Sequence, residues 1–261
     1  MLIDTHTHIA DAEFDRDRDA VIERALASDV RRMILIGTGL ESSRRAVALA
    51  ERHPFLWATV GLHPHESKKL DNHLIKMLAQ LADHPKVVGW GETGLDFYYN
   101  HATYDTQVFA FTQQIRLAKE KRLPLVIHTR DAWDETFDIL TKEGIKEHAA
   151  TYGAVLHCFT GNRKIAERAT DLGLYVSFSG IMTFKKADEI REAAAAIDLN
   201  KIVIETDAPY LTPEGFRGKR NEPAYVRRIA ERLAEVRHLS FAEVSKATSK
   251  NAERLFPRIL S

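Results

Sequence analysis

The segment Leu2-Ile3-Asp4-Thr5-His6-Thr7-His8 places two histidines one residue apart, directly behind the first apolar residues of the chain. If Leu2–Asp4 is a β-strand that continues into this motif, the two-residue period of a strand points His6 and His8 to the same side at its C-terminal end. Two imidazoles on one side of a strand can share a metal ion. The alternative is a pair of polar residues in a loop. Only further ligand-type residues elsewhere in the sequence can distinguish the two interpretations.

Apolar, β-branched segments alternate with amphipathic ones along the whole chain. The expected strands are Leu2–Asp4, Arg32–Gly37, Leu56–Gly61, Val87–Gly91, Leu125–His128, Ala154–His157, Leu174–Ser179 and Ile202–Glu205. Between strands, segments such as Arg16–Ala27, Thr103–Lys121 and Ala132–Lys142 have apolar residues at helical spacing. Eight such pairs predict parallel strands, right-handed crossovers and an α/β fold, the closed TIM (β/α)8 barrel. The helical tail, Ala224–Val236 and Phe241–Leu255, is expected to close and cover the barrel.

The main alternative fold is an open doubly wound sheet, but no G-x-G-x-x-G motif follows the first strand. No Gly/Ser-rich, Pro-rich or like-charge linker divides the sequence, which predicts a single domain over residues 1–261. The N-terminus lacks the pattern of a signal peptide and no apolar run is long enough to span a membrane, so a cytoplasmic protein is expected. Cys158 is the only cysteine, which suits a reducing compartment. We expect it to be a small buried hydrophobe.

Metal-ligand residue types follow six of the predicted strands. They are His6 and His8, then His63 and His65, Glu92 and Asp96, His128 with Arg130, His157, and finally Glu205 and Asp207. Each alone has an ordinary explanation, because a histidine can be a hydrogen-bonded core residue and an acid can cap a helix. A closed barrel, however, brings the C-terminal ends of its strands together. Several imidazoles and two carboxylates exceed the needs of one ion, which indicates two metal ions sharing a bridging ligand.

Seven short motifs follow one another across nearly the whole chain: DTHTH, GLHPH, GETGLD, HTRDA, HCFTG, ETDAPYL and RNEP. In these motifs the chain resembles the TatD-like metal-dependent deoxyribonucleases, within the amidohydrolase-like metal-dependent hydrolases. The resemblance implies a TIM barrel with two divalent metal ions, Mg²⁺, Mn²⁺ or Zn²⁺, and hydrolysis of phosphodiester bonds at DNA ends by a 3′–5′ exonuclease. It assigns one ion to His6, His8, Glu92 and Asp207. It assigns the other to His128, His157 and the same Glu92, which would bridge the two.

The resemblance also suggests catalytic roles. Asp207 is expected to orient the attacking water and accept its proton, beside the bridging Glu92. Glu205, two residues earlier on the same strand, is expected either to hold a ligand imidazole by a hydrogen bond or to form a structural salt bridge beneath the site. His63 resembles the residue that contacts the scissile phosphate. His65, beyond Pro64, is expected to be structural.

The chain has 37 Lys+Arg and 37 Asp+Glu, so its formal net charge is zero and DNA would have to be held locally. We expect a single-stranded or frayed DNA end as the partner, with no membrane and no obligate protein partner. Candidate phosphate contacts are Arg130, Gly161–Lys164, Lys185–Lys186, Arg217, Lys219 and Arg220. The last three lie in PYLTPEGFRGKRNEP, which lacks periodicity and is expected to form a long loop over the barrel mouth. Solvation alone explains charged loop residues equally well.

Phe97, Tyr98 and Tyr99, just past Glu92, are candidates to stack on a terminal base, although ordinary loop packing also explains them. Two other functions stay open from the residues themselves. A barrel with two metals also supports hydrolysis of a small-molecule amide, ester, lactone or phosphoester, or of a D-aminoacyl-tRNA. A non-catalytic protein with a fossil site predicts a lost ligand, and none is lost.

Overall fold

The computed structural model describes residues 1–99 and 101–260. Eight strands form one sheet in the sequential order β1 to β8, with parallel pairing between every two neighbours. The strands are β1 (Leu2–Thr7), β2 (Val30–Leu35), β3 (Leu56–Val60), β4 (Val87–Asp96), β5 (Leu125–Arg130), β6 (Ala154–Leu156), β7 (Tyr175–Phe178) and β8 (Ile202–Ile204). The predicted TIM barrel is confirmed.

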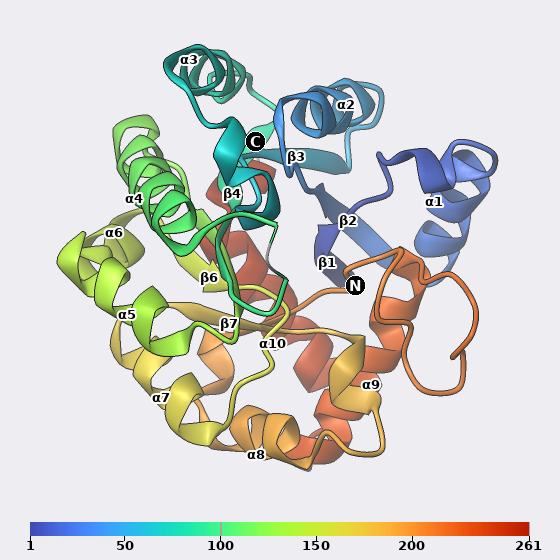
Figure 1. The fold of residues 1–261 in the computed structure, drawn as a ribbon. Coiled ribbons are helices and arrows are strands. Elements are labelled where there is room, and N and C mark those ends of the chain that lie inside the picture. The colour runs from blue at the N-terminus through green and yellow to red at the C-terminus, as the bar shows by residue number, and fades with distance from the viewer. Residues whose placement is uncertain (100, 261) are drawn as a thin grey trace.

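Helices follow the strands and surround them. The α-helices are α1 (Arg18–Ala27), α2 (Leu40–Glu51), α3 (Asn72–Leu81), α4 (Tyr104–Lys121), α5 (Trp133–Lys142), α6 (Ile145–Thr151), α7 (Arg163–Asp171), α8 (Asp188–Ala196), α9 (Val226–Arg237) and α10 (Phe241–Leu255). Short 3-10 helices are η1 (Ala12–Phe14), η2 (Pro64–Lys69), η3 (Gly180–Thr183), η4 (Leu199–Lys201), η5 (Pro223–Tyr225) and η6 (Pro257–Leu260). In Figure 1, α10 lies behind the strands, the loop that follows β4 lies in front of them, and the loop that follows β8 lies to one side, near α1 and α9.

The first and last strands are joined just beyond the end of β8. The backbone N–H of Asp207 donates to the carbonyl of His6 at 2.9 Å, and the N–H of His8 donates to the carbonyl of Ala208 at 2.7 Å. Thr7 and Ala208 form an isolated parallel bridge. The residues that close the barrel are therefore the candidate site residues themselves or their chain neighbours.

Three strands run further at their C-terminal ends than their apolar segments predict: β1 reaches Thr7, β5 reaches Arg130, and β4 extends the most. β4 was expected to end at Gly91 but continues through Glu92 to Asp96, and its register with β5 pairs Asp96 with Arg130. The polar residues stay in the strand because their backbone groups still pair with the neighbouring strand. Gly94 is required there, since a Cβ at this position would overlap the carbonyl oxygen of His128. Both ends of the β4 extension thus carry a carboxylate into the barrel mouth.

The barrel interior is apolar at the end opposite the candidate site. Its core is formed by Ile3, Ile34, Ile36, Trp57, Val88, Val126, Val155 and Val203, which pack with Ala252, Leu255, Phe256 and Ile259 from α10 and η6. Polar contacts fix the tail to the strand starts, since Ser245 Oγ donates to the Met1 carbonyl at 2.6 Å and Asn251 Nδ2 donates to the Ile202 carbonyl at 2.7 Å. The prediction that the tail covers the barrel is confirmed. Among the described residues, none of the helices combines the length and apolar character that crossing a membrane would require.

Candidate metal centre

The predicted ligand residues converge at the C-terminal ends of the strands. His6 and His8 come from the end of β1, Glu92 from β4, His157 from just after β6 and Asp207 from just after β8, and all five are buried. His128 of β5 is half-buried beside them. Glu92 lies at the centre of the group, because its two carboxylate oxygens face different sets of imidazoles.

The Oε2 atom of Glu92 faces the first strand. It lies 3.4 Å from His6 Nε2 and 4.0 Å from His8 Nε2. Asp207 Oδ1 approaches the same two nitrogens, at 3.6 Å from His6 and 3.3 Å from His8. Three carboxylate and imidazole groups of this set, from His6, His8 and Glu92, have ligand atoms within 4.8 Å of one another.

The Oε1 atom of Glu92 faces the middle strands. It lies 2.9 Å from His157 Nε2, 3.1 Å from His128 Nδ1 and 3.4 Å from His63 Nε2. His128 Nδ1 and His157 Nε2 are themselves 3.4 Å apart. The rings of His6 and His157 stack at a centroid distance of 3.8 Å. The imidazoles that face Oε2 and those that face Oε1 of Glu92 are therefore in direct contact with each other.

Two further carboxylates hold the imidazoles from outside. Glu205 Oε1 lies 3.1 Å from His157 Nδ1 and also accepts the backbone N–H of Cys158 at 2.6 Å. Asp96 Oδ2 lies 3.1 Å from His128 Nε2 and 2.9 Å from His65 Nε2. In His157 and His128 the carboxylate engages one ring nitrogen and leaves the other facing Glu92. Of the two sequence alternatives for Glu205, the contact with His157 has the geometry of a carboxylate that orients an imidazole.

His63 differs from His128 and His157 in that, among the described residues, no outer carboxylate contacts its other ring nitrogen, which accepts a backbone N–H instead. Its Nδ1 accepts the backbone N–H of His65 at 3.2 Å, so the neutral ring carries its proton on Nε2, which points at Glu92. Burial, with repulsion from neighbouring imidazoles, lowers the pKa of His63 to about 4, which keeps the ring neutral at pH 7. Although His63, Glu92 and His128 also form a group compact enough for a metal, this tautomer makes His63 a hydrogen-bond donor rather than a ligand.

The carboxylates and imidazoles of the cluster shift one another's pKa values. Burial alone would raise the pKa of Glu92, but the adjacent imidazoles, that of His157 above all, hold it well below its usual range. Burial likewise opposes the charge of His157, yet Glu92 and Glu205 raise its pKa well above the ordinary value. Asp207 keeps a lowered pKa against burial because His8 hydrogen-bonds it. Glu92 and Asp207 are therefore ionised at neutral pH.

The donor set fits a divalent cation. His6 Nε2 and His8 Nε2 are 3.2 Å apart, and His157 Nε2 and Glu92 Oε1 are 2.9 Å apart, so a proton or a metal ion must lie between the two atoms of each pair. His6 Nδ1 has no hydrogen-bond partner in the described part of the chain, which leaves Nε2 as its only engaged nitrogen. Imidazole nitrogens with carboxylate oxygens are ligands for zinc, manganese and related metals. The residues present can therefore hold metal.

Aromatic and basic side chains surround this centre. The Arg130 guanidinium lies over the rings of Tyr98 at 4.0 Å and Tyr99 at 4.9 Å, and all three residues are exposed. We call these three residues the aromatic platform. On the other side of the centre, the exposed Tyr210 lies with its ring centroid 5.9 Å from that of His8. Phe97 instead packs on Tyr104, as the ordinary-packing alternative expects.

The predicted basic loop residues have different partners. Arg217 lies over the Phe184 ring at 4.3 Å, and Lys219 is 6.0 Å from the centroid of Phe216. Arg220 is engaged by Asp17, with Nη2 at 2.8 and 2.6 Å from the two carboxylate oxygens. It thereby ties the loop after β8 to the segment next to η1 (Figure 1). In the Gly161–Lys164 segment, Asn162 caps α7 and Arg163 pairs with Glu167.

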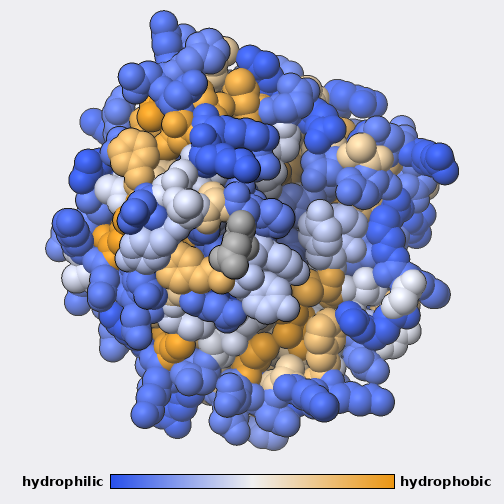
Figure 2. Space-filling model, in the orientation of Figure 1, coloured by the Kyte–Doolittle hydropathy of each residue, from blue (hydrophilic) through white to orange (hydrophobic). Residues whose placement is uncertain are grey.

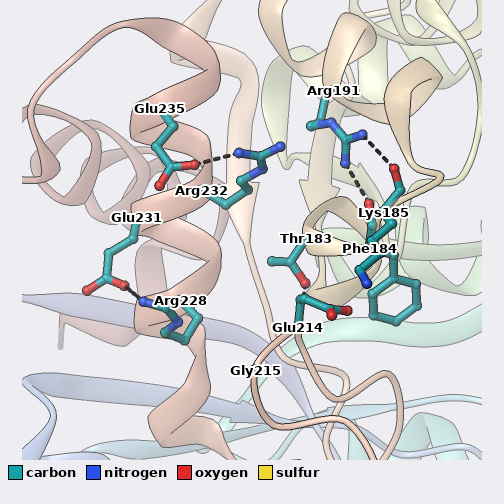
Figure 3. A pocket seen from close by; sticks show the side chains of 10 residues that line it. All are labelled: Thr183, Phe184, Lys185, Arg191, Glu214, Gly215, Arg228, Glu231, Arg232 and Glu235. Carbon is teal, nitrogen blue, oxygen red and sulfur yellow. Dashed lines mark hydrogen bonds and ion pairs between the residues drawn. The ribbon is translucent and has the colours of Figure 1, made fainter.

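Lys185 lines a cavity of about 420 Å³ between η3, the loop after β8 and α9. Figure 3 shows its arginines already paired: Arg228 with Glu231, Arg232 with Glu235, and Arg191 with backbone carbonyls of the η3 loop. This cavity therefore offers little unpaired positive charge. Across the whole face, hydrophilic residues predominate and apolar ones are scattered among them (Figure 2).

Sequence reasoning missed three features of the site. Asp96 was noted at a strand end but given no role, and His65 shares its carboxylate. Tyr210, in the ETDAPYL motif, was not considered for substrate contact. Cys158 was expected to be a buried hydrophobe but is only half-buried, and its backbone N–H donates a hydrogen bond to Glu205 Oε1. The four-residue spacing of Glu92 and Asp96, which puts both on one side of a strand, was the signal available for Asp96.

A TIM barrel with buried imidazoles and carboxylates converging at its strand ends is the architecture of a metal-dependent hydrolase. The sequence model of the family described as "TatD related DNase" matches residues 3–257. The chain belongs to the TatD family of metal-dependent hydrolases.

Relatives resemble the chain over almost its full length. It is 40% identical over 256 residues to "Uncharacterized metal-dependent hydrolase YabD" of Bacillus subtilis strain 168, covering 98% of this chain and 99% of that protein. It is 38% identical over 260 residues to "3'-5' ssDNA/RNA exonuclease TatD" of Salmonella typhimurium strain LT2, covering 98% of both. The crystal structure of YJJV, a TatD homolog from Escherichia coli K12, matches with a TM-score of 0.91 at 31% identity over 98% of each chain.

Proposed function

We propose that the protein is a two-metal 3′–5′ exonuclease that hydrolyses phosphodiester bonds at single-stranded or frayed DNA ends, without an obligate protein partner. The observation that carries the proposal is Glu92, whose Oε2 faces His6 and whose Oε1 faces His128 and His157. A carboxylate with an oxygen toward each of two imidazole sets suits two neighbouring cations, an arrangement used by many phosphoester hydrolases. The Salmonella relative is named a 3'-5' ssDNA/RNA exonuclease, which supports the proposed polarity of cutting.

One ion would be held by His6, His8, Glu92 and Asp207, and the other by Glu92, His128 and His157. Mn²⁺ and Zn²⁺ suit so many imidazoles, while Mg²⁺ suits the carboxylates and a phosphate substrate. When bound, the two cations would offset the phosphodiester charge and lower the pKa of the attacking water.

The chain's own residues supply the remaining chemistry. Asp207 is ionised and lies beside both His6 and His8, so it can orient the attacking water and take up its proton. His63, neutral and protonated on Nε2, can donate to a phosphate oxygen next to Glu92. Glu205 fixes the His157 ring so that Nε2 faces the centre.

The surroundings of the centre favour a nucleic acid end as the substrate. The aromatic platform and Tyr210 lie on opposite sides of the imidazoles, where each can stack on an unpaired base. Arg217 and Lys219 are the remaining candidates for phosphate contact in the loop after β8. A chain of zero net charge with a few local cations suits a short single-stranded end better than long duplex DNA.

The test is degradation of end-labelled single-stranded DNA by the purified protein, Glu92→Ala and Asp207→Ala, first in EDTA and then with Mg²⁺, Mn²⁺ or Zn²⁺ restored. We expect laddering from the 3′ end that requires metal and is lost in both variants. Closed circular DNA should be resistant. If no metal restores cutting while the protein still binds two ions, the DNA assignment fails and a small-molecule ester or aminoacyl-tRNA takes its place. Equal cutting of circular and linear DNA would exclude the exonuclease.

A further inference from the structure

We infer that Asp96 is a positioning residue that joins the ligand His128 to the aromatic platform through a single carboxylate. The side chain is 1% exposed and receives four N–H groups. Oδ2 lies 3.1 Å from His128 Nε2 and 2.9 Å from His65 Nε2. Oδ1 accepts the backbone N–H groups of Tyr98 at 3.0 Å and Tyr99 at 2.9 Å. The inference rests on the proposed function for the substrate contacted by the platform.

The Oδ2 half controls the tautomer of His128. A carboxylate only accepts hydrogen bonds, so the contact places the ring proton of neutral His128 on Nε2. The Nδ1 lone pair is then free, and this is the atom 3.1 Å from Glu92 Oε1. Outer carboxylates of this kind orient imidazole ligands and strengthen their binding to metal.

The Oδ1 atom of Asp96 fixes the backbone of the loop that follows β4. The two N–H groups that it accepts fix the backbone of Tyr98 and Tyr99, whose rings hold the Arg130 guanidinium. Gln107 of α4 secures the other side of the junction, since its side chain accepts the Asp96 N–H at 2.8 Å and donates to the Asp96 carbonyl at 3.0 Å. Gln107 therefore fixes the backbone of Asp96, while the two carboxylate oxygens accept hydrogen bonds from different partners.

Asp96→Asn separates the two halves. The amide oxygen should stay on the two backbone N–H groups, because an NH₂ there would face two donors. The NH₂ group must then face His128 Nε2, which can accept only if the ring proton moves to Nδ1. A protonated Nδ1 has no lone pair for a metal and would point its hydrogen at Glu92. Asp96→Ala, by contrast, removes both halves.

The experiment compares the full chain with Asp96→Asn, Asp96→Ala and the control Asp71→Asn, whose carboxylate also accepts a backbone N–H but caps α3. Three quantities are measured: Mn²⁺ binding to metal-free protein by calorimetry, kcat and KM on a single-stranded oligonucleotide, and amide hydrogen exchange at residues 98 and 99. For Asp96→Asn we expect Mn²⁺ to bind about 10- to 100-fold more weakly at one position. Its kcat should fall, while KM and amide protection stay as in the unmodified protein.

Asp96→Ala should show the same loss of Mn²⁺ affinity together with a raised KM and loss of amide protection at both tyrosines. Asp71→Asn should match the unmodified protein throughout. Unchanged Mn²⁺ affinity in Asp96→Asn, or equal loss of amide protection in both Asp96 variants, would overturn the inference. If the unmodified protein cuts no oligonucleotide, the proposed function fails, but Mn²⁺ binding and amide exchange still decide the role of Asp96. If Asp96→Ala does not fold, the Asp96→Asn arm decides alone.

Discussion

Glu205 holds His157 from the side opposite Glu92, with 3.1 Å between Glu205 Oε1 and His157 Nδ1 and 2.9 Å between His157 Nε2 and Glu92 Oε1. The same Glu205 oxygen also accepts the Cys158 N–H, and the other oxygen accepts from Ser177 Oγ at 2.6 Å. One ring is thus fixed between two carboxylates, with opposite nitrogens engaged.

This arrangement predicts that Glu205→Gln is milder than Glu205→Ala. Glutamine can keep its carbonyl oxygen on both His157 and Cys158, because Ser177 Oγ is able to accept from the NH₂ group that replaces Oε2. The His157 tautomer is preserved. Alanine removes the acceptor and should weaken metal binding and lower kcat, with affinity falling about 10- to 100-fold. Calorimetric metal titration and oligonucleotide kinetics measure both. Equal damage in the two variants would mean that the negative charge of Glu205, rather than its acceptor oxygen, is what His157 needs.

Asp4 predicts a pH-dependent difference in stability. It is fully buried beside Thr206, with 2.9 Å from the Thr206 N–H to Oδ1 and 2.5 Å between Thr206 Oγ1 and Oδ2. Burial raises its pKa from 3.8 to about 8, against the hydrogen bonds. Because the folded-state pKa is raised, the contribution of Asp4 to stability is fully present below about pH 4 and is lost as pH rises to about 8.

Asparagine at position 4 mimics the protonated acid, so Asp4→Asn should remove this slope. The free energy of unfolding of the variant relative to the unmodified protein should rise by up to about 1.4 kcal/mol per pH unit between pH 5 and 8, then level off. Urea unfolding of metal-free protein at pH 5 to 9 gives the difference directly. A difference that stays constant over this range would show that Asp4 is ionised throughout.

Arg220 is predicted to support DNA binding by holding the loop after β8 in place, and not by contacting a DNA phosphate. It forms two contacts with Asp17 and lies over the Phe14 ring at 4.2 Å. If it tethers the loop, Arg220→Ala and Asp17→Ala should raise the KM for an oligonucleotide alike, and the double variant should be no worse than either. Because the pair is exposed, the cost in stability should stay below about 1 kcal/mol. A raised KM in Arg220→Ala alone would restore the phosphate contact expected from the sequence.

The locations of the strands were predictable because burial and hydrogen bonding repeat with simple periods. Apolar, β-branched runs located the eight strands, and the two-residue period with barrel closure then brought His6, Glu92 and Asp207 together. The N-terminus of α10 was also predictable, since Ser240 and Glu243 form a capping box with the first turn.

Asp96 and Arg220 were less predictable for a shared reason. The role of Asp96 depends on which ring nitrogens of His65 and His128 turn toward it, and strand periodicity does not specify a ring rotation. The partner of Arg220, Asp17, is 203 residues away in the sequence. The loop that carries Arg220 lacks periodicity, so only the folded chain determines which charge Arg220 meets.

The aromatic platform predicts a selective loss of oligonucleotide affinity. Tyr98 is 55% exposed and lies against Arg130, which suits a ring that stacks on an unpaired base. Loss of one base stack in Tyr98→Ala should raise the KM for a single-stranded oligonucleotide about 5- to 150-fold. Kinetics on an aryl phosphodiester without a nucleobase should not change. Phe109→Ala on α4 is the matched control, because Phe109 is also 55% exposed.

Arg130→Ala completes this prediction, because it removes a charge as well as the contact with both tyrosines. If Arg130 binds a phosphate, the slope of log affinity against log salt should decrease by about 0.7 for a single strand. Tyr98→Ala should leave that slope unchanged, since stacking releases no counterion. Oligonucleotide binding measured between about 50 and 200 mM salt therefore separates the phosphate contact of Arg130 from the base stacking of Tyr98. If both variants changed KM on the aryl phosphodiester as much as on DNA, the platform would be acting on the metal centre itself and not on the bases.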